Sequence, residues 1–176
     1  MRDTVGREGV LQTLARLRSI SLAPVLPQLG EGFEQGSARL AATFEILAEI
    51  RDKEEKALIF CESLELQPLL AVEIRRRFRI PHPIACISGE VAGDRRQQLV
   101  NQFQSRSHGF DVMILSPRAG GVGLTLTAAN HVIHLTRWWN PAVEDQATDR
   151  VYRIGQDREV TVWLSIAEYP AYRESS

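Results

Sequence analysis

Short apolar runs alternate with longer segments of helical periodicity along most of this chain, and this alternation is the main clue to its fold. Five runs of four or five mostly apolar residues fall at 57–61, 84–88, 112–116, 132–135 and 160–164. A strand that is buried on both faces needs no polar alternation, and parallel strands need helical crossovers between them. The pattern therefore predicts an α/β domain of three layers, with a mostly parallel sheet covered by helices on both faces.

The segments between these runs carry apolar residues three and four positions apart, which is the spacing of one helix face. Such segments are predicted to be helices at 37–51, 66–78, 94–104 and after Pro141. Ser37 is a suitable N-cap, because a serine hydroxyl can accept a hydrogen bond from an otherwise unpaired amide of the first helical turn.

The chain divides into a leading part, a main unit and a tail. Residues 1–36 are predicted to hold a helix at 8–20 and an exposed connection at 23–36, which contains two prolines and three glycines. The main unit covers residues 37–164. Residues 165–176 show no obvious closing element, so we expect a truncated tail and a fragment of a longer protein.

Composition narrows the function classes only a little. The formal net charge is -1 and the pI is about 6.4, so nucleic-acid binding would need local clusters of charge. Cys61 and Cys86 lack metal-ligand spacing and are interpreted as reduced core residues, and no metal site is predicted from the four histidines. No apolar run reaches membrane-spanning length and no signal-peptide pattern opens the chain, so we expect a cytoplasmic protein that does not contact a membrane.

The predicted helix after Asn140 carries the most informative polar residues. Asn140 suits the N-cap, Pro141 suits the first helical position, and Gly155 suits a left-handed C-cap. Arg150 and Arg153 are three residues apart and share one polar face of this helix. Two guanidinium groups on one face can be directed at a single anion.

Simpler interpretations of the arginines remain open. Asp149 and Arg153 have the i,i+4 spacing of an ordinary ion pair on a helix surface. A second basic cluster, Arg75, Arg76 and Arg77, lies at the end of another predicted helix, where cations favour the helix dipole. We interpret this second cluster as a solvated helix end rather than as a nucleic-acid surface.

Three loops follow predicted strands, at 62–63, 88–90 and 116–123, and loops in this position carry the functional residues of open α/β sheets. The last loop combines a hydroxyl, a cation and three glycines, whose amides could approach phosphate oxygens: Ser116, Arg118, Gly120, Gly121 and Gly123. A tight turn without a ligand remains the alternative. The chain contains no G-x-x-x-x-G-K-[ST] motif and no acidic pair that would serve its magnesium ion.

Taken together, these segments resemble the C-terminal RecA-like lobe of Swi/Snf-type helicase-like ATPases, most closely prokaryotic members. The resemblance covers residues 11–163. Its most specific parts are the run 119–130, the triplet Trp139-Asn140-Pro141 and the helix 146–156.

The resemblance implies the second motor lobe of an ATP-dependent translocase or remodeller acting on double-stranded DNA. ATP with magnesium would bind only together with an N-terminal RecA-like lobe of the same protein, so the isolated chain is expected to be inactive. Arg150 and Arg153 would act as arginine fingers. Residues that would contact the nucleotide are Gln146, Gly121 and Gly123. Residues that would contact DNA are Ser88, Ser116, Arg118, Gly120 and Trp139.

The chain departs from the family pattern at a few positions. Thr136 lies near a position where aspartate is common, Arg39 replaces a common lysine, and the usual brace helix does not follow Val162. One alternative is a non-catalytic RecA-like module that binds nucleic acid or protein. A strand-separating RNA helicase shares the arginine chemistry but suits the Trp139-Asn140-Pro141 triplet less well.

Overall fold

The structure is a computed structural model that describes residues 29–30, 32–35, 37–106, 109–117, 124–135, 149 and 156–164. Its elements are α2 (Ala38–Asp52), β1 (Lys56–Phe60), α3 (Leu66–Phe78), β2 (Ala85–Ile87), α4 (Gly93–Ser105), β3 (Asp111–Leu115), β4 (His131–His134) and β5 (Thr161–Leu164). Each of these lies within a residue or two of an element that the sequence predicts. The predicted helix at 8–20 and the helix after Pro141 lie outside the described residues.

Local sequence signals set the helix ends. The Ser37 hydroxyl accepts a hydrogen bond from the Leu40 amide at 3.2 Å, which confirms Ser37 as the N-cap of α2. Helix α3 ends at Arg79, which adopts the left-handed conformation with φ 54°. The carbonyl of Arg75 accepts from the amide of Ile80, so the last turn is closed in the usual way for a left-handed cap.

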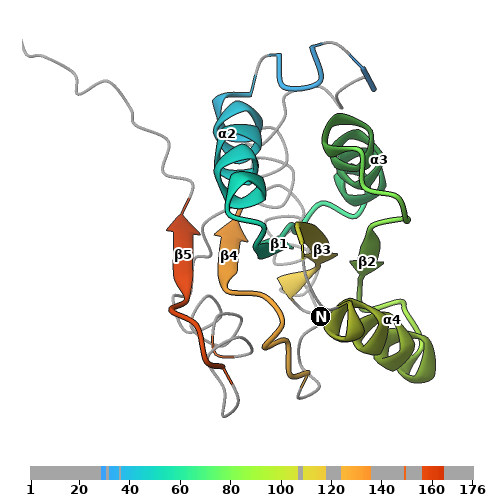
Figure 1. Cartoon of the computed structure of the whole chain (residues 1–176). Coiled ribbons are helices and arrows are strands. Elements are labelled where there is room, and N and C mark those ends of the chain that lie inside the picture. Colours follow the sequence, from blue (N-terminus) through green and yellow to red (C-terminus); the bar gives the residue numbers. More distant parts are fainter. Residues whose placement is uncertain are drawn as a thin grey trace, which may run out of the picture.

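All strand pairs in the described part of the sheet are parallel, in the order β2-β3-β1-β4-β5 (Figure 1). Strand β1 lies at the centre and pairs with β3 on one side and β4 on the other. The predicted parallel sheet is therefore confirmed. Strands β2 and β5 are the two edges.

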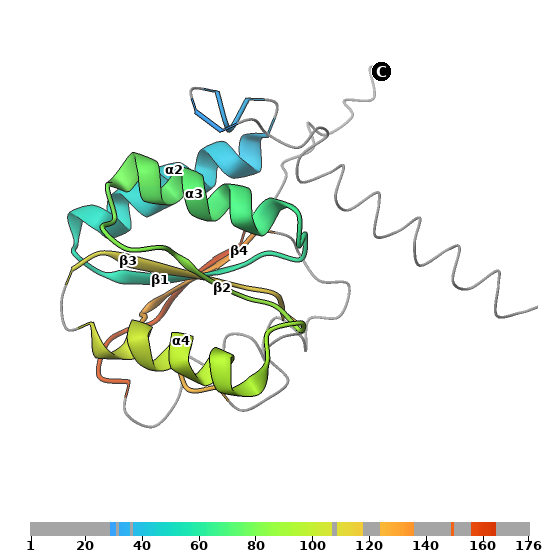
Figure 2. The ribbon, with the colours of Figure 1, turned by 90° about the vertical axis from the view of Figure 1, so that its right-hand side faces the viewer.

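Helices cover both faces of the sheet, as the sequence predicts (Figure 2). Helices α2 and α3 lie on one face and α4 lies on the other. Side chains of β1 alternate between the two layers of core: Ile59 packs in the cluster with α2 and α3, and Leu58 and Phe60 pack in the cluster with α4. Burying one such side chain stabilises the fold by about 1.5–3 kcal/mol, which is why the apolar run after Lys56 favours a strand covered on both faces.

A buried carboxylate holds the described part of the 23–36 connection against α3. Glu73 has no exposed side-chain surface, and it accepts hydrogen bonds from the Gly30 amide (3.2 Å) and from Arg76 (2.6 Å). Arg77 bridges Glu73 and Glu34 at 3.4 and 2.7 Å. These contacts agree with a structural interpretation of the basic helix end, because two of its three arginines are ion-paired within the fold.

The described part of this connection corrects the prediction that it is exposed. Phe33 is completely buried, and its ring lies edge-on to Phe44 with centroids 5.9 Å apart. Leu29 remains about half exposed. The glycines and prolines are typical of an exposed loop, but a single aromatic side chain that packs into the core is enough to anchor the segment.

Edge strand β5 is attached to β4 by a side-chain hydrogen-bond chain. The Trp163 indole donates to Nδ1 of His131 at 3.2 Å, and Nε2 of His131 lies 2.5 Å from the Glu55 carboxylate. This pattern places the ring proton on Nε2, because Nδ1 must accept. Burial raises the pKa of Glu55, but hydrogen bonds from His131 and Asn130 outweigh this effect, so that the pKa lies below its ordinary value.

None of the described helices has the length and apolar character of a membrane span.

We expect Glu73→Gln to lower the free energy of unfolding by about 1–3 kcal/mol at pH 7, because the charge-assisted bonds to the arginines are lost inside the protein. The hydrogen bond from Arg76 is the main reason why the pKa of Glu73 lies below its ordinary 4.5. A lowered pKa gives stability that is present above the ordinary value and is lost as the pH falls through the lowered one. Urea denaturation at pH 7 and at pH 3 should therefore show a smaller difference between wild type and variant at pH 3.

Glu49→Gln is the matched control, since Glu49 is an exposed glutamate on α2. It should change stability by no more than about 0.5 kcal/mol at either pH. An equal effect of both substitutions at pH 7 would contradict the role given to Glu73.

Candidate functional site

The carboxyl ends of four neighbouring strands meet at one edge of the sheet. Phe60 is in register with Leu115 and His134, and Leu115 is in register with Ile87. The alignment continues past the strands, because the Ser116 amide donates to the Ile87 carbonyl at 2.8 Å. The loops that follow β1, β2 and β3 therefore leave the sheet side by side.

Two predicted site residues, Ser88 and Ser116, are brought together at this edge. They follow the paired residues Ile87 and Leu115 directly, on adjacent strands. Ser88 is half-buried, and its hydroxyl accepts from the Glu90 amide at 3.3 Å. Ser116 is 7% exposed. Their placement agrees with the sequence prediction, whereas their predicted role in DNA binding stays a prediction.

The other predicted site residues lie outside the described residues. They are Arg118, Gly120, Gly121, Gly123, Trp139, Gln146, Arg150 and Arg153. Asp149 is described and is exposed. Its predicted ion pair with Arg153 remains a prediction for the same reason.

A buried glutamine, for which the sequence predicts no role, stabilises the turn at the carboxyl end of β1. Gln67, in the first turn of α3, is 3% exposed and donates to the Cys61 carbonyl at 2.9 Å. The Ser63 hydroxyl accepts from the Leu66 amide at 3.2 Å. These bonds fix the short turn between β1 and α3. A polar residue in an otherwise apolar helical stripe is the signal that could have identified Gln67.

The two cysteines at this end of the sheet are not poised as nucleophiles. Burial raises the pKa of Cys61 to about 12 and that of Cys86 to about 11. The thiolate is the reactive form of cysteine, so both side chains stay protonated and unreactive at neutral pH. Both are free thiols, and the prediction of a core residue is confirmed for Cys61, which is buried, whereas Cys86 is half-buried at the margin of the core.

No group of three or more metal-ligating side chains occurs among the described residues. The two histidines that flank β4 have separate surroundings. His131 belongs to the chain between Glu55 and Trp163, whereas His134 stacks on Phe60 with ring centroids 5.1 Å apart. The carboxyl edge, as far as it is described, presents hydroxyls and backbone amides rather than a metal site.

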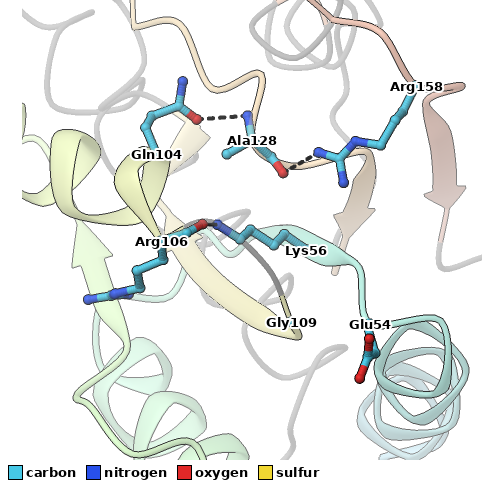
Figure 3. Close-up of a pocket in the computed structure, with 7 residues that line it drawn as sticks. All are labelled: Glu54, Lys56, Gln104, Arg106, Gly109, Ala128 and Arg158. Atoms are coloured by element: carbon cyan, nitrogen blue, oxygen red, sulfur yellow. Dashed lines mark hydrogen bonds between the residues drawn. The ribbon is translucent and has the colours of Figure 1, made fainter.

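The opposite, amino edge of the sheet contains a hollow of about 310 Å³ (Figure 3). Its lining residues are Glu54, Lys56, Gln104, Arg106, Gly109, Ala128 and Arg158. Lys56 is 4% exposed and donates to the carbonyls of Phe103 and Arg106, at the carboxyl end of α4. Burial lowers the pKa of Lys56, and the charge of Asp111 opposes this shift.

The three cationic side chains of this hollow, Lys56, Arg106 and Arg158, all bind groups within the fold. Lys56 supplies a positive charge to the end of α4, where the helix dipole is negative. Arg106 pairs with Asp111 at 2.7 Å, and Arg158 donates to the carbonyl of Ala128. The sequence signal for this arrangement is a lysine at the start of an apolar strand, because such a lysine must find acceptors inside the fold.

Comparison with known families gives one match over most of the chain. Residues 39–155 match the family described as the helicase conserved C-terminal domain. The matched range begins in α2 and extends beyond β4.

Curated relatives match along nearly the whole chain. The putative ATP-dependent helicase/translocase YwqA of Bacillus subtilis is 41% identical over 156 residues, which are 87% of this chain and 16% of that protein. The Zorya protein ZorD of Escherichia coli is 39% identical over 173 residues, which are 95% of this chain and 15% of that protein. The chain thus spans about one sixth of the length of these relatives.

A solved structure shows the same fold. The SWI2/SNF2 ATPase core of Sulfolobus solfataricus, solved in complex with dsDNA, superimposes with a TM-score of 0.71 at 34% sequence identity. The match covers 94% of this chain and 34% of that protein.

Proposed function

The chain belongs to the helicase conserved C-terminal domain family, in its Swi/Snf-type branch, and from this we propose that it is the second motor lobe of an ATP-dependent translocase on double-stranded DNA. The single observation that carries the proposal is the carboxyl edge of the sheet. There the residues after β1, β2 and β3 converge, with Ser88 and Ser116 on adjacent strands. This is the edge at which open parallel sheets bind their ligands.

The phosphoryl chemistry is assigned to the arginines of the 146–156 segment. ATP with magnesium, held mainly by an N-terminal RecA-like lobe, would supply the phosphoryl group. Arg150 and Arg153 would neutralise charge that develops on the transferred phosphoryl oxygens, which is the role of an arginine finger. Gln146 would contact the nucleotide from the same segment, and the amides of Gly121 and Gly123 would approach it from the preceding loop.

Contact with DNA is assigned to the sugar-phosphate backbone rather than to the bases. Ser88 and Ser116 carry hydroxyls, a group that suits phosphate oxygens. Arg118 and Gly120 would extend this row along the glycine-rich loop, with Trp139 beside it. Backbone contacts of this kind position a duplex without reading its sequence, as a translocase requires.

Substitution of the arginines tests the catalytic part of the proposal. In the whole two-lobed protein, Arg150→Ala or Arg153→Ala should reduce DNA-stimulated ATP turnover by about 10³- to 10⁵-fold, the range seen for arginine fingers. Arg150→Lys should recover little activity, because lysine keeps the charge but lacks the planar fork of donors. Phosphate release measured with saturating duplex DNA gives the comparison.

Arg75→Ala serves as the control, since Arg75 is an exposed arginine on α3. It should leave turnover within twofold of wild type. If Arg153 only pairs with Asp149, alanine there would cost about 0.3–0.5 kcal/mol of stability and turnover would stay normal. Normal turnover together with a slightly lower Tm would rule out the finger assignment and favour a non-catalytic module.

DNA binding by the 176-residue chain should be weak, independent of sequence and steeply dependent on salt, because it would rest on phosphate contacts. Fluorescence anisotropy with two unrelated duplexes at several salt concentrations measures all three properties. Arg118→Ala should reduce the slope of log K against log salt by about 1, the value for one lost phosphate contact. Tight binding to only one duplex, or binding that is insensitive to salt, would contradict the proposal.

A further inference from the structure

Three consecutive backbone carbonyls before β4 are all bound by side chains that come from just before β5. Gln156 donates through its amide to the carbonyls of Thr127 (3.1 Å) and Ala129 (2.7 Å). Arg158 donates through its guanidinium to the carbonyl of Ala128, between these two (Figure 3). We call this arrangement, which joins Gln156 and Arg158 to residues 127–129, the 127–129 clasp.

The clasp is built so that Gln156 cannot easily be replaced. Its amide oxygen accepts from the Arg158 amide at 3.1 Å, so the side chain uses its donor and acceptor ends at once. Only a neutral carboxamide of this length offers both. The turn at 126–129, which carries the three carbonyls, belongs to the core, because the side chains of Leu126 and Ala129 are completely buried.

The same turn is held from its other side by α4. Gln104 accepts from the Ala128 amide at 2.7 Å and donates to the Thr127 hydroxyl at 3.3 Å (Figure 3). Gln104 and Gln156 thus each make two hydrogen bonds to the turn at 127–129. Gln104 ties the turn to α4, whereas Gln156 ties it to the chain that leads into β5.

The position of the clasp in the chain gives it a role that Gln104 does not have. Thr127 is four residues after Gly123, the end of the glycine-rich loop, and Gln156 is three residues after Arg153. The clasp therefore joins the exit of the loop assigned to DNA and nucleotide to the exit of the segment assigned to phosphoryl transfer. The two exits are thus linked by hydrogen bonds as well as by the intervening chain.

We propose that Gln156 is a positioning residue that couples DNA contact at the glycine-rich loop to the arginine-bearing segment. The inference rests on the function proposed above, and it adds a residue for which the carboxyl edge gives no role. Gln156 would touch neither nucleotide nor DNA. It would keep the glycine-rich loop and the arginine-bearing segment in a fixed relation, so that the duplex accelerates hydrolysis.

The test compares Gln156→Met with Gln104→Met in the whole two-lobed protein. Both substitutions keep the side-chain length and remove hydrogen bonds to the same turn. ATP turnover is measured with and without saturating duplex DNA, together with KM for ATP and the Tm of each variant. Gln156→Met should lower the ratio of DNA-stimulated to basal turnover by about 3- to 30-fold, the range expected when a coupling network loses one member.

Gln104→Met should lower the Tm by a similar amount and leave this ratio within twofold of wild type. If both variants lower the ratio equally, rigidity of the turn rather than its link to Gln156 controls coupling, and the inference is overturned. An unchanged ratio in Gln156→Met with a lower Tm also overturns it, because the clasp then serves stability alone. Should Gln156→Met fail to fold, Arg158→Met removes the central bond from an exposed position and should lower the ratio in the same direction. An unchanged ratio in folded Arg158→Met would then overturn the inference.

Wild-type turnover separates this inference from the proposed function. If DNA does not stimulate the wild-type protein, the proposed function fails and the coupling role fails with it. If DNA stimulates wild type and Arg150→Ala abolishes turnover, the proposed function stands, and the Gln156→Met ratio decides the coupling role alone.

Discussion

The common direction of the paired strands is the constraint on which the rest of the molecule depends. Parallel strands must be joined by crossovers, and here α3 and α4 form two of these, one on each face of the sheet. The same constraint sends every loop that follows a strand to one edge and every loop that precedes a strand to the other. The proposed DNA contacts and the hydrogen bonds that support the fold are thereby separated: Ser88 and Ser116 lie at the carboxyl edge, and Lys56, Arg158 and Gln156 lie at the amino edge.

Much of this arrangement could be predicted because it depends on short-range signals. A short apolar run such as that of β1 favours a strand buried on both faces, and Ser37 marks the start of α2 through a bond to a residue three positions away. The neighbouring positions of Ser88 and Ser116 follow from the parallel rule once the strands are known. The roles proposed for Arg150 and Arg153 rest instead on resemblance to a family, because the spacing of residues on a predicted helix fits an ion pair as well as an arginine finger.

Contacts between distant segments could not be predicted, because they depend on which turns the packed helices bring together. Glu73 binds the Gly30 amide across 43 residues, and Lys56 reaches the carboxyl end of α4 across 47. In the sequence Gln156 is only the last residue of the 146–156 segment, whereas its two acceptors are backbone carbonyls 27 and 29 residues earlier. A sequence pattern shows the side chain in each case and carries no trace of its backbone partner, whether that partner is the Gly30 amide or a carbonyl.

The strand order also has a consequence for how the chain is made. Among the described residues, strand β2 pairs with β3 alone, and β3 lies between β2 and β1. Synthesis delivers β1 and β2 before β3, and the native positions of β1 and β2 lie about 10 Å apart, two strand spacings, with the place of β3 between them. The ladder hydrogen bonds of β2 have no partner until Leu115 has left the ribosome. The loop that begins with Ser88 therefore reaches its native position only after β3 has paired with both β1 and β2.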